Sequence, residues 1–76
     1  MSELPSVTGR QAVSAFNRLG FSVVRIRGSH HIMKKAGHGY NLSVPVHQGE
    51  ILKKGTLRDL IGAAGVTAQE FVAALR

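Results

Sequence analysis

The sequence predicts an α+β fold, in which a three-stranded antiparallel sheet carries helices on one face. Three observations favour this fold. A segment with helical spacing of apolar residues opens the chain, three short strand-like segments follow it, and two more helical segments close it. The breaks between the strand-like segments are short and contain glycine, as in hairpins. The 76 residues suffice for one domain, 1–76, with a small core, because such a domain buries only about 60% of its unfolded surface.

The first predicted helix covers residues 9–19. Thr8 and Gln11 have the spacing of a capping box, in which each side chain bonds the backbone amide of the other residue. Gly20 stands where a C-terminal cap belongs. Apolar residues recur at helical spacing inside this segment: Ala12, Val13, Phe16 and Leu19. The pattern predicts an amphipathic helix that packs on the sheet.

Three strands are predicted over 21–27, 31–35 and 40–46. The first is rich in β-branched and aromatic residues, and the third alternates apolar and polar residues, which indicates burial on one face. Gly28 allows a tight reversal or a bulge between the first two strands. Pro45 has no backbone N–H, so the third strand should lie at an edge there or end.

Two helices are predicted after a loop at 47–55. Thr56 can cap the first of them, and Gly65 can end it. Thr67 and Glu70 form a second capping box, which should open a short final helix. We expect helices 9–19 and 56–64 to pack on the same face of the sheet. The predicted core is Val13, Phe16, Leu42, Val44, Leu57, Leu60 and Ile61.

Positive charge is concentrated in the middle of the chain. Ten Lys and Arg residues oppose four acidic ones, which gives a net charge of +6. Between positions 25 and 54 only Glu50 is acidic, and the cations there are Arg25, Arg27, Lys34, Lys35, Lys53 and Lys54. Such a charge attracts polyanions, of which nucleic acid is one. A surface tuned for solubility, or one that meets an acidic protein, would show the same excess.

The composition also bears on location and cofactors. The chain has no cysteine, which fits a reducing compartment and leaves no thiolate for metal binding. It has no apolar run long enough to span a membrane and no signal peptide at its start. We therefore expect a cytoplasmic protein with no membrane partner. We also expect no metal or other cofactor, since carboxylates are scarce near the four histidines.

His30 has the neighbours that acid–base chemistry on RNA requires. Imidazole accepts and returns a proton near neutral pH. Gly28 lets the backbone approach a bulky ligand, and Ser29 offers a hydroxyl group. His30 and His31 should point to opposite faces of a strand, so one faces the helices and the other faces substrate. The cations expected near this site are Arg25, Arg27 and Lys34.

Other chemistries fit the sequence less well. A Ser–His–carboxylate triad lacks nearby carboxylates, and no P-loop motif is present. Lys53 and Lys54 precede a helix whose first amides could help them bind phosphate. For His38 we expect an ordinary structural role with a satisfied hydrogen bond. RNA supplies its own nucleophile, the 2′-hydroxyl, so histidine and cations suffice for its cleavage.

Four ordered blocks of the chain resemble the HicA family of toxin mRNA interferases. They are Gly28-Ser29-His30-His31, Val44-Pro45-Val46-His47, Leu52-Lys53-Lys54-Gly55-Thr56-Leu57, and Ala64-Gly65-Val66-Thr67 with Glu70-Phe71. The likeness extends over about residues 10–72, nearly the whole chain. It implies a fold like that of double-stranded-RNA-binding domains, and cleavage of mRNA by the toxin of a type II toxin–antitoxin system.

The resemblance also implies a site and a partner. The catalytic residue would be His30 in the Gly-Ser-His motif, framed by Gly28 and Ser29, and the partner would be a HicB-like antitoxin. Whether His31 shares the catalytic role is open at this stage. Two rival functions remain: a non-catalytic RNA-binding module, and a protein-interaction domain whose basic surface meets an acidic partner.

Overall fold

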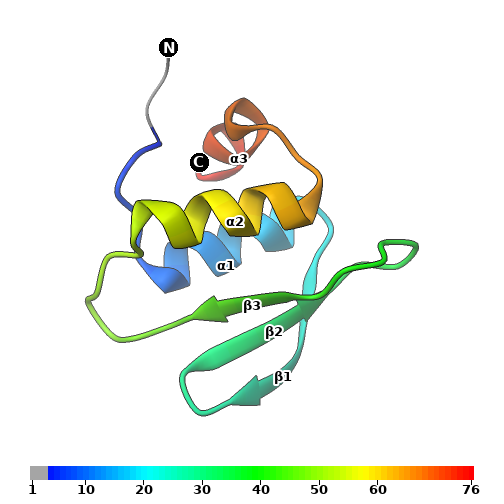
Figure 1. Ribbon diagram of the computed structural model, residues 1–76, viewed down its shortest axis with the longest axis horizontal. Helices are drawn as coiled ribbons and strands as arrows, with labels where there is room; N and C mark the ends of the chain where they lie inside the picture. The colour runs from blue at the N-terminus through cyan, green and yellow to red at the C-terminus, as the bar shows by residue number, and fades with distance from the viewer. Residues whose placement is uncertain (1–3) are drawn as a thin grey trace.

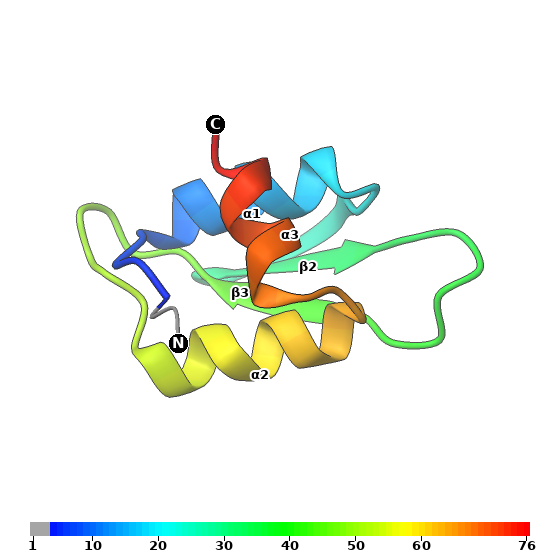
Figure 2. The same ribbon diagram turned by 90° about the horizontal axis from the view of Figure 1, so that it is seen from above.

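The computed structural model describes residues 4–76. Its elements follow in the order α1 (Gly9–Arg18), β1 (Ser22–Arg27), β2 (His30–Lys34), β3 (Leu42–Pro45), α2 (Lys54–Ala64) and α3 (Ala68–Ala74). The strands form one antiparallel sheet in the order β1-β2-β3. Figure 1 shows α1 and α2 on the same face of this sheet, and Figure 2 shows α3 lying over them. The predicted α+β fold is confirmed.

The first helix, α1, has the N-terminal capping box that its sequence predicts. Gln11 N donates to Thr8 Oγ1 over 3.1 Å, and Thr8 N donates to Gln11 Oε1 over 2.8 Å, which completes the predicted capping box. The helix ends at Arg18, one residue earlier than predicted, because Leu19 is the C-cap. Gly20 follows it with a φ of 105°, which only glycine adopts without strain.

The strands are shorter or shifted by one or two residues from their predicted ranges. The third strand, expected over 40–46, pairs only over Leu42–Pro45. Pro45 is its last residue on an edge strand, as its missing N–H predicts. The register of β1 against β2 shifts between Val23 and Arg25, so the bulge lies at Val24. Of the two roles predicted for Gly28, it therefore has the reversal and not the bulge.

The predicted start of α2 is wrong. Thr56 does not cap this helix; it lies in the first turn, two residues after the helix begins. Lys53 is the N-cap and makes no side-chain capping bond. Leu57 N donates to Lys53 O over 3.0 Å, so the helical ladder begins before Thr56 could act as a cap. Gly65 ends the helix in a left-handed conformation, as predicted.

The core lies between the sheet and the three helices. All the predicted core residues are buried except Val13, which is only partly covered. The ring of Phe16 lies at its centre, 6.1 Å from the ring of Phe21 and 5.1 Å from that of Phe71. Thr67 and Glu70 form the predicted capping box that opens α3 and so fixes Phe71 over α1. Within residues 4–76, no helix combines the length and the apolarity needed to cross a membrane.

A glycine allows α1 to approach the end of β3. A Cβ atom on Gly9 would overlap the carbonyl oxygen of Pro45 and lie 2.9 Å from the Cα atom of Val46. Gly9 is fully covered in the fold. This close contact fixes the end of β3 relative to α1, and the residues that follow Pro45 start from there.

Candidate functional site

His30 stands at the tip of the β1–β2 hairpin. It is the first residue of β2 and pairs with Arg27, the last residue of β1. Gly28 and Ser29 form the two-residue turn between them, and Gly28 has a φ of 59°. Glycine with positive φ at the first turn position is what type II′ hairpins require. The turn thus places the imidazole and the guanidinium next to each other, because paired residues have Cβ atoms about 4.5–5.5 Å apart.

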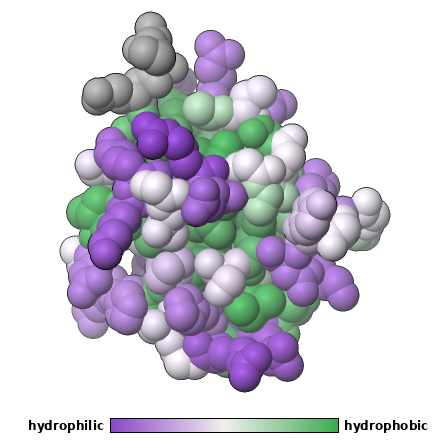
Figure 3. Space-filling model, in the orientation of Figure 1, coloured by the Kyte–Doolittle hydropathy of each residue, from purple (hydrophilic) through white to green (hydrophobic). Residues whose placement is uncertain are grey.

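The helix-free face of the sheet carries most of the predicted site. Paired residues share a face and successive residues alternate between faces, so the register assigns each side chain. Arg27 pairs with His30, and Arg25 pairs with Ile32, two residues further along β2. Lys34 lies two residues beyond Ile32 in β2, so it is on the same face. The residues of this set, which we call the basic face, are all exposed: Arg25, Arg27, His30 and Lys34. Figure 3 shows hydrophilic side chains gathered at the lower end of the molecule, over this hairpin.

The two adjacent histidines separate as predicted. His31 pairs with Val44, which is fully buried, so its ring faces the helices and is half-buried. His30 pairs with Pro45 and is exposed. The geometry therefore leaves His30 as the histidine of this pair that a large substrate can reach.

Of the other predicted site residues, some lie near His30 and some lie away from it. Ser29 adjoins His30, and its backbone oxygen accepts from Val46 N over 2.7 Å. Lys53 is exposed and lies beyond Pro45 on the wall of a pocket. Lys54 differs from it, since its Nζ donates to the backbone oxygen of Leu4. The structure therefore brings Lys53 toward the site and holds Lys54 against the N-terminal segment.

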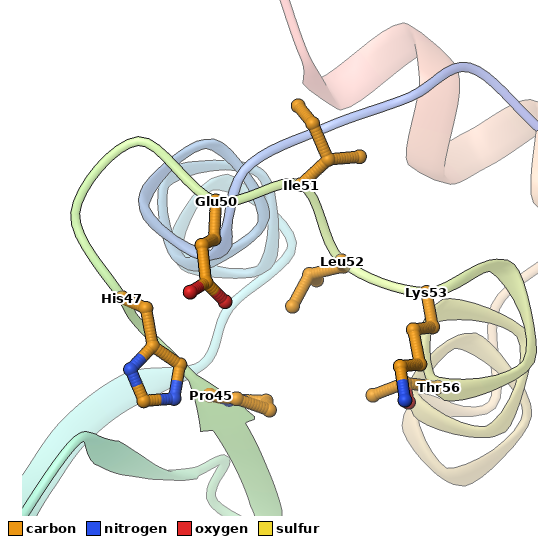
Figure 4. Close-up of a pocket in the computed structure, with 7 residues that line it drawn as sticks. All are labelled: Pro45, His47, Glu50, Ile51, Leu52, Lys53 and Thr56. Carbon is orange, nitrogen blue, oxygen red and sulfur yellow. The ribbon is translucent and has the colours of Figure 1, made fainter.

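A pocket of about 270 Å³ opens beside the end of β3. Figure 4 shows His47 on one side of Pro45 and Lys53 on the other, with the Glu50 carboxylate pointing between them. The lining residues are Pro45, His47, Glu50, Ile51, Leu52, Lys53 and Thr56. Pro45 is also the residue that faces His30 across the ladder. The pocket therefore adjoins the basic face.

His38 has the structural role expected of it. Its Nε2 lies 2.7 Å from the backbone oxygen of Ala63, near the end of α2. Its ring packs edge-on against Phe21, with 5.3 Å between the ring centroids. This contact holds the β2–β3 loop on the core and keeps His38 away from the basic face. No three potential metal ligands gather anywhere within residues 4–76.

His47 and its pocket had no assigned role in the sequence. Two signals for them existed. His47 ends the Val44-Pro45-Val46-His47 block of the resemblance, and Pro45 and His47 are two residues apart, so a strand that continued would place both on one face. The turn at residues 48–49 and the distant contribution of Thr56 leave no comparable local pattern.

Comparisons with known proteins place the chain in a family. The family model described as the HicA toxin of bacterial toxin–antitoxin systems matches residues 9–66. A search of curated proteins returned no significant match.

Proposed function

Because the chain belongs to the HicA family of toxins of bacterial toxin–antitoxin systems, we propose that it is an endoribonuclease that cleaves mRNA. The observation that supports this most directly is the exposed His30 on the helix-free face, paired with Arg27. Arg25 and Lys34 add positive charge on the same face. A base beside cations is what cleavage of a polyanion with an internal nucleophile needs.

The proposed reaction uses the ribose itself. Neutral His30 accepts the proton of a 2′-hydroxyl while that oxygen attacks the adjacent phosphorus. The bond from phosphorus to the 5′-oxygen then breaks, and the products are a 2′,3′-cyclic phosphate and a 5′-hydroxyl. Arg27 and its neighbours on the basic face stabilise the additional negative charge on the phosphoryl oxygens. The proposed reaction uses no metal ion, because His30 takes the proton and the cations of the basic face stabilise the charge.

Gly28 and Ser29 support this site in different ways. Gly28 supplies the turn that brings His30 level with Arg27, and it leaves room above the backbone, since no atom lies within 4 Å of where its Cβ would be. Ser29 joins the turn to β3 through its bond with Val46. Lys53, at the neighbouring pocket, extends the cationic surface toward the next phosphate of the RNA.

The family role implies an antitoxin partner, and we propose a HicB-like protein that covers the basic face. The whole domain would act in the cytoplasm, where its mRNA substrate is translated. An enzyme that degrades the cell's own mRNA must be held inactive until stress. A partner with an acidic surface would meet a chain of net charge +6 with favourable steering.

The decisive test compares purified wild type with His30→Ala on a long single-stranded RNA in the presence of EDTA. We expect wild type to cleave and the variant to bind without cleaving. A substrate with 2′-deoxyribose at the cleaved position should bind and stay intact, because it lacks the nucleophile. Binding without cleavage by wild type, both with and without EDTA, would instead identify a non-catalytic RNA-binding module. Cleavage of the deoxy substrate would contradict the role of His30. Loss of RNA cleavage when EDTA is added would contradict it too.

A further inference from the structure

The backbone ladder between β2 and β3 continues past the last strand residue. His30 pairs with Pro45, and Val46 N then donates to Ser29 O over 2.7 Å. In an antiparallel ladder the next position in this register places His47 opposite Gly28. His47 is exposed and lies two residues beyond Pro45, so it belongs to the same face as His30.

This register makes His47 the diagonal neighbour of His30. Diagonal positions across a pair of strands are about 7–8 Å apart, within reach of long and aromatic side chains. A phosphodiester group between two imidazoles at that spacing can contact both of them. Figure 4 shows the His47 ring beside Pro45, the residue that separates the pocket from His30.

The loop that carries His47 is fixed at both ends. Glu50 N donates to His47 O over 3.0 Å, which closes a turn directly after His47. Leu52 N then donates to Val7 O over 2.8 Å, and Ile51 forms a bridge with Thr8. The pocket wall is therefore formed before any ligand binds. Among the side-chain hydrogen bonds within residues 4–76, none engages His47 or Lys53.

We infer that His47 donates the proton to the leaving 5′-oxygen, and that its pocket holds the nucleotide on that side of the cleaved bond. In this step the 2′-oxygen gives its proton to His30 and bonds to phosphorus. The bond from phosphorus to the 5′-oxygen breaks, and that oxygen takes the proton of the His47 imidazolium. His30 finishes protonated and His47 neutral, and exchange with water restores both.

The lining of the pocket suits one nucleotide. Its volume of about 270 Å³ is just below the roughly 300–1,000 Å³ of pockets for drug-sized ligands. Pro45, Ile51 and Leu52 supply apolar surface for a base, and Lys53 supplies an ammonium group for a phosphate. A nucleotide seated there would extend past Pro45 to His30, which places the cleaved bond between the two histidines.

This inference rests on the proposed ribonuclease activity, and the test separates the two. A cleavage site is first mapped with wild type on a long RNA, and an oligonucleotide is built around it. A second oligonucleotide carries sulfur in place of the 5′-bridging oxygen at that site. A thiolate leaves without a proton from the enzyme, so the sulfur substrate needs the base alone.

We expect His47→Ala to cleave the oxygen substrate about 10²–10⁴-fold more slowly than wild type and to recover most of this loss on the sulfur substrate. His30→Ala should stay slow on both substrates. The matched control is His31→Ala, a neighbouring histidine that faces the helices, which should cleave both substrates at close to the wild-type rate. Thermal unfolding of each variant verifies that the fold is kept.

A wild-type rate for His47→Ala, or an equal loss on both substrates, would overturn the inference and leave the nuclease standing. If wild type cleaves no RNA, both proposals fail.

Discussion

At the scale of single residues, the adjacent His30 and His31 show how strand register sends two identical side chains to opposite faces of a sheet. Their order in a strand predicts opposite faces, and the pairing of His31 with buried Val44 fixes which one faces the helices. The sequence could not make that assignment, because it depends on which face of the sheet the helices cover. The same limit hid the diagonal relation between His30 and His47.

The first prediction concerns the adjacent histidines, His30 and His31. His30→Ala should reduce RNA cleavage by about 10²–10⁴-fold, the usual contribution of a positioned acid or base. His31→Ala should reduce it much less, since this ring points away from the basic face. Single-turnover cleavage of a long RNA measures both rates. A larger loss for His31→Ala than for His30→Ala would mean that the catalytic assignment is reversed.

At the scale of elements, local signals predicted the ends of helices well where the signals were self-contained. The capping boxes at Thr8 and Thr67 involve residues three positions apart, so the sequence displays all their parts. Thr56 looked equally suitable as an N-cap, but the loop enters α2 earlier and the helix begins at Lys54. The start of that helix depends on how the chain reaches it, which no local pattern records.

The second prediction concerns the contact between α1 and β3. Gly9→Ala should destabilise the fold by about 1–3 kcal/mol, the usual cost of overpacking, because its new methyl group overlaps the backbone at Pro45. Gly62→Ala is the matched control. It adds the same methyl group at an exposed position inside α2 with no atom within 4 Å, so it should stabilise by about 0.4–1 kcal/mol. Urea unfolding curves compare the two free energies.

Equal stability of the two glycine variants would show that α1 and β3 can separate without cost. Activity adds a second readout, since Pro45 connects the basic face to the pocket. A Gly9→Ala protein that still folds should cleave RNA more slowly, because the end of β3 must shift away from the new side chain.

At the scale of the whole molecule, the distribution of charge bears on both the proposed RNA substrate and the antitoxin partner. The net charge of +6 and the concentration of cations between positions 25 and 54 are visible in the sequence, and the fold places three of them on the helix-free face. RNA and an acidic antitoxin would compete for this surface. Lys54, one of the predicted contacts, donates to the backbone oxygen of Leu4, near the start of the chain. Such long-range pairs leave no mark in a sequence.

The third prediction is that the antitoxin covers the basic face. In the complex, His30 should resist acylation by diethyl pyrocarbonate, while in the free toxin it should react readily. His38 is the internal reference, because it is half-buried and its ring is bonded away from the basic face, so its reactivity should not change on binding. Arg25→Glu with Arg27→Glu should slow association with the antitoxin, since charges at an interface chiefly steer the encounter. A complex in which His30 reacts freely and RNA still binds would contradict this arrangement.

The last prediction separates two neighbouring lysines by their salt dependence. Each phosphate that a cation neutralises on single-stranded RNA contributes roughly −0.7 to the slope of log K against log salt concentration. Lys53 is exposed at the pocket wall, so Lys53→Ala should flatten the slope by about that amount. Lys54 donates to Leu4 O, so Lys54→Ala should leave the slope nearly unchanged while lowering stability slightly. Filter binding of an uncleavable 2′-deoxy-substituted RNA at several salt concentrations measures both slopes. Equal slopes for the two variants would show that RNA does not distinguish these lysines, and the path of the strand past Pro45 into the pocket would then have to be redrawn.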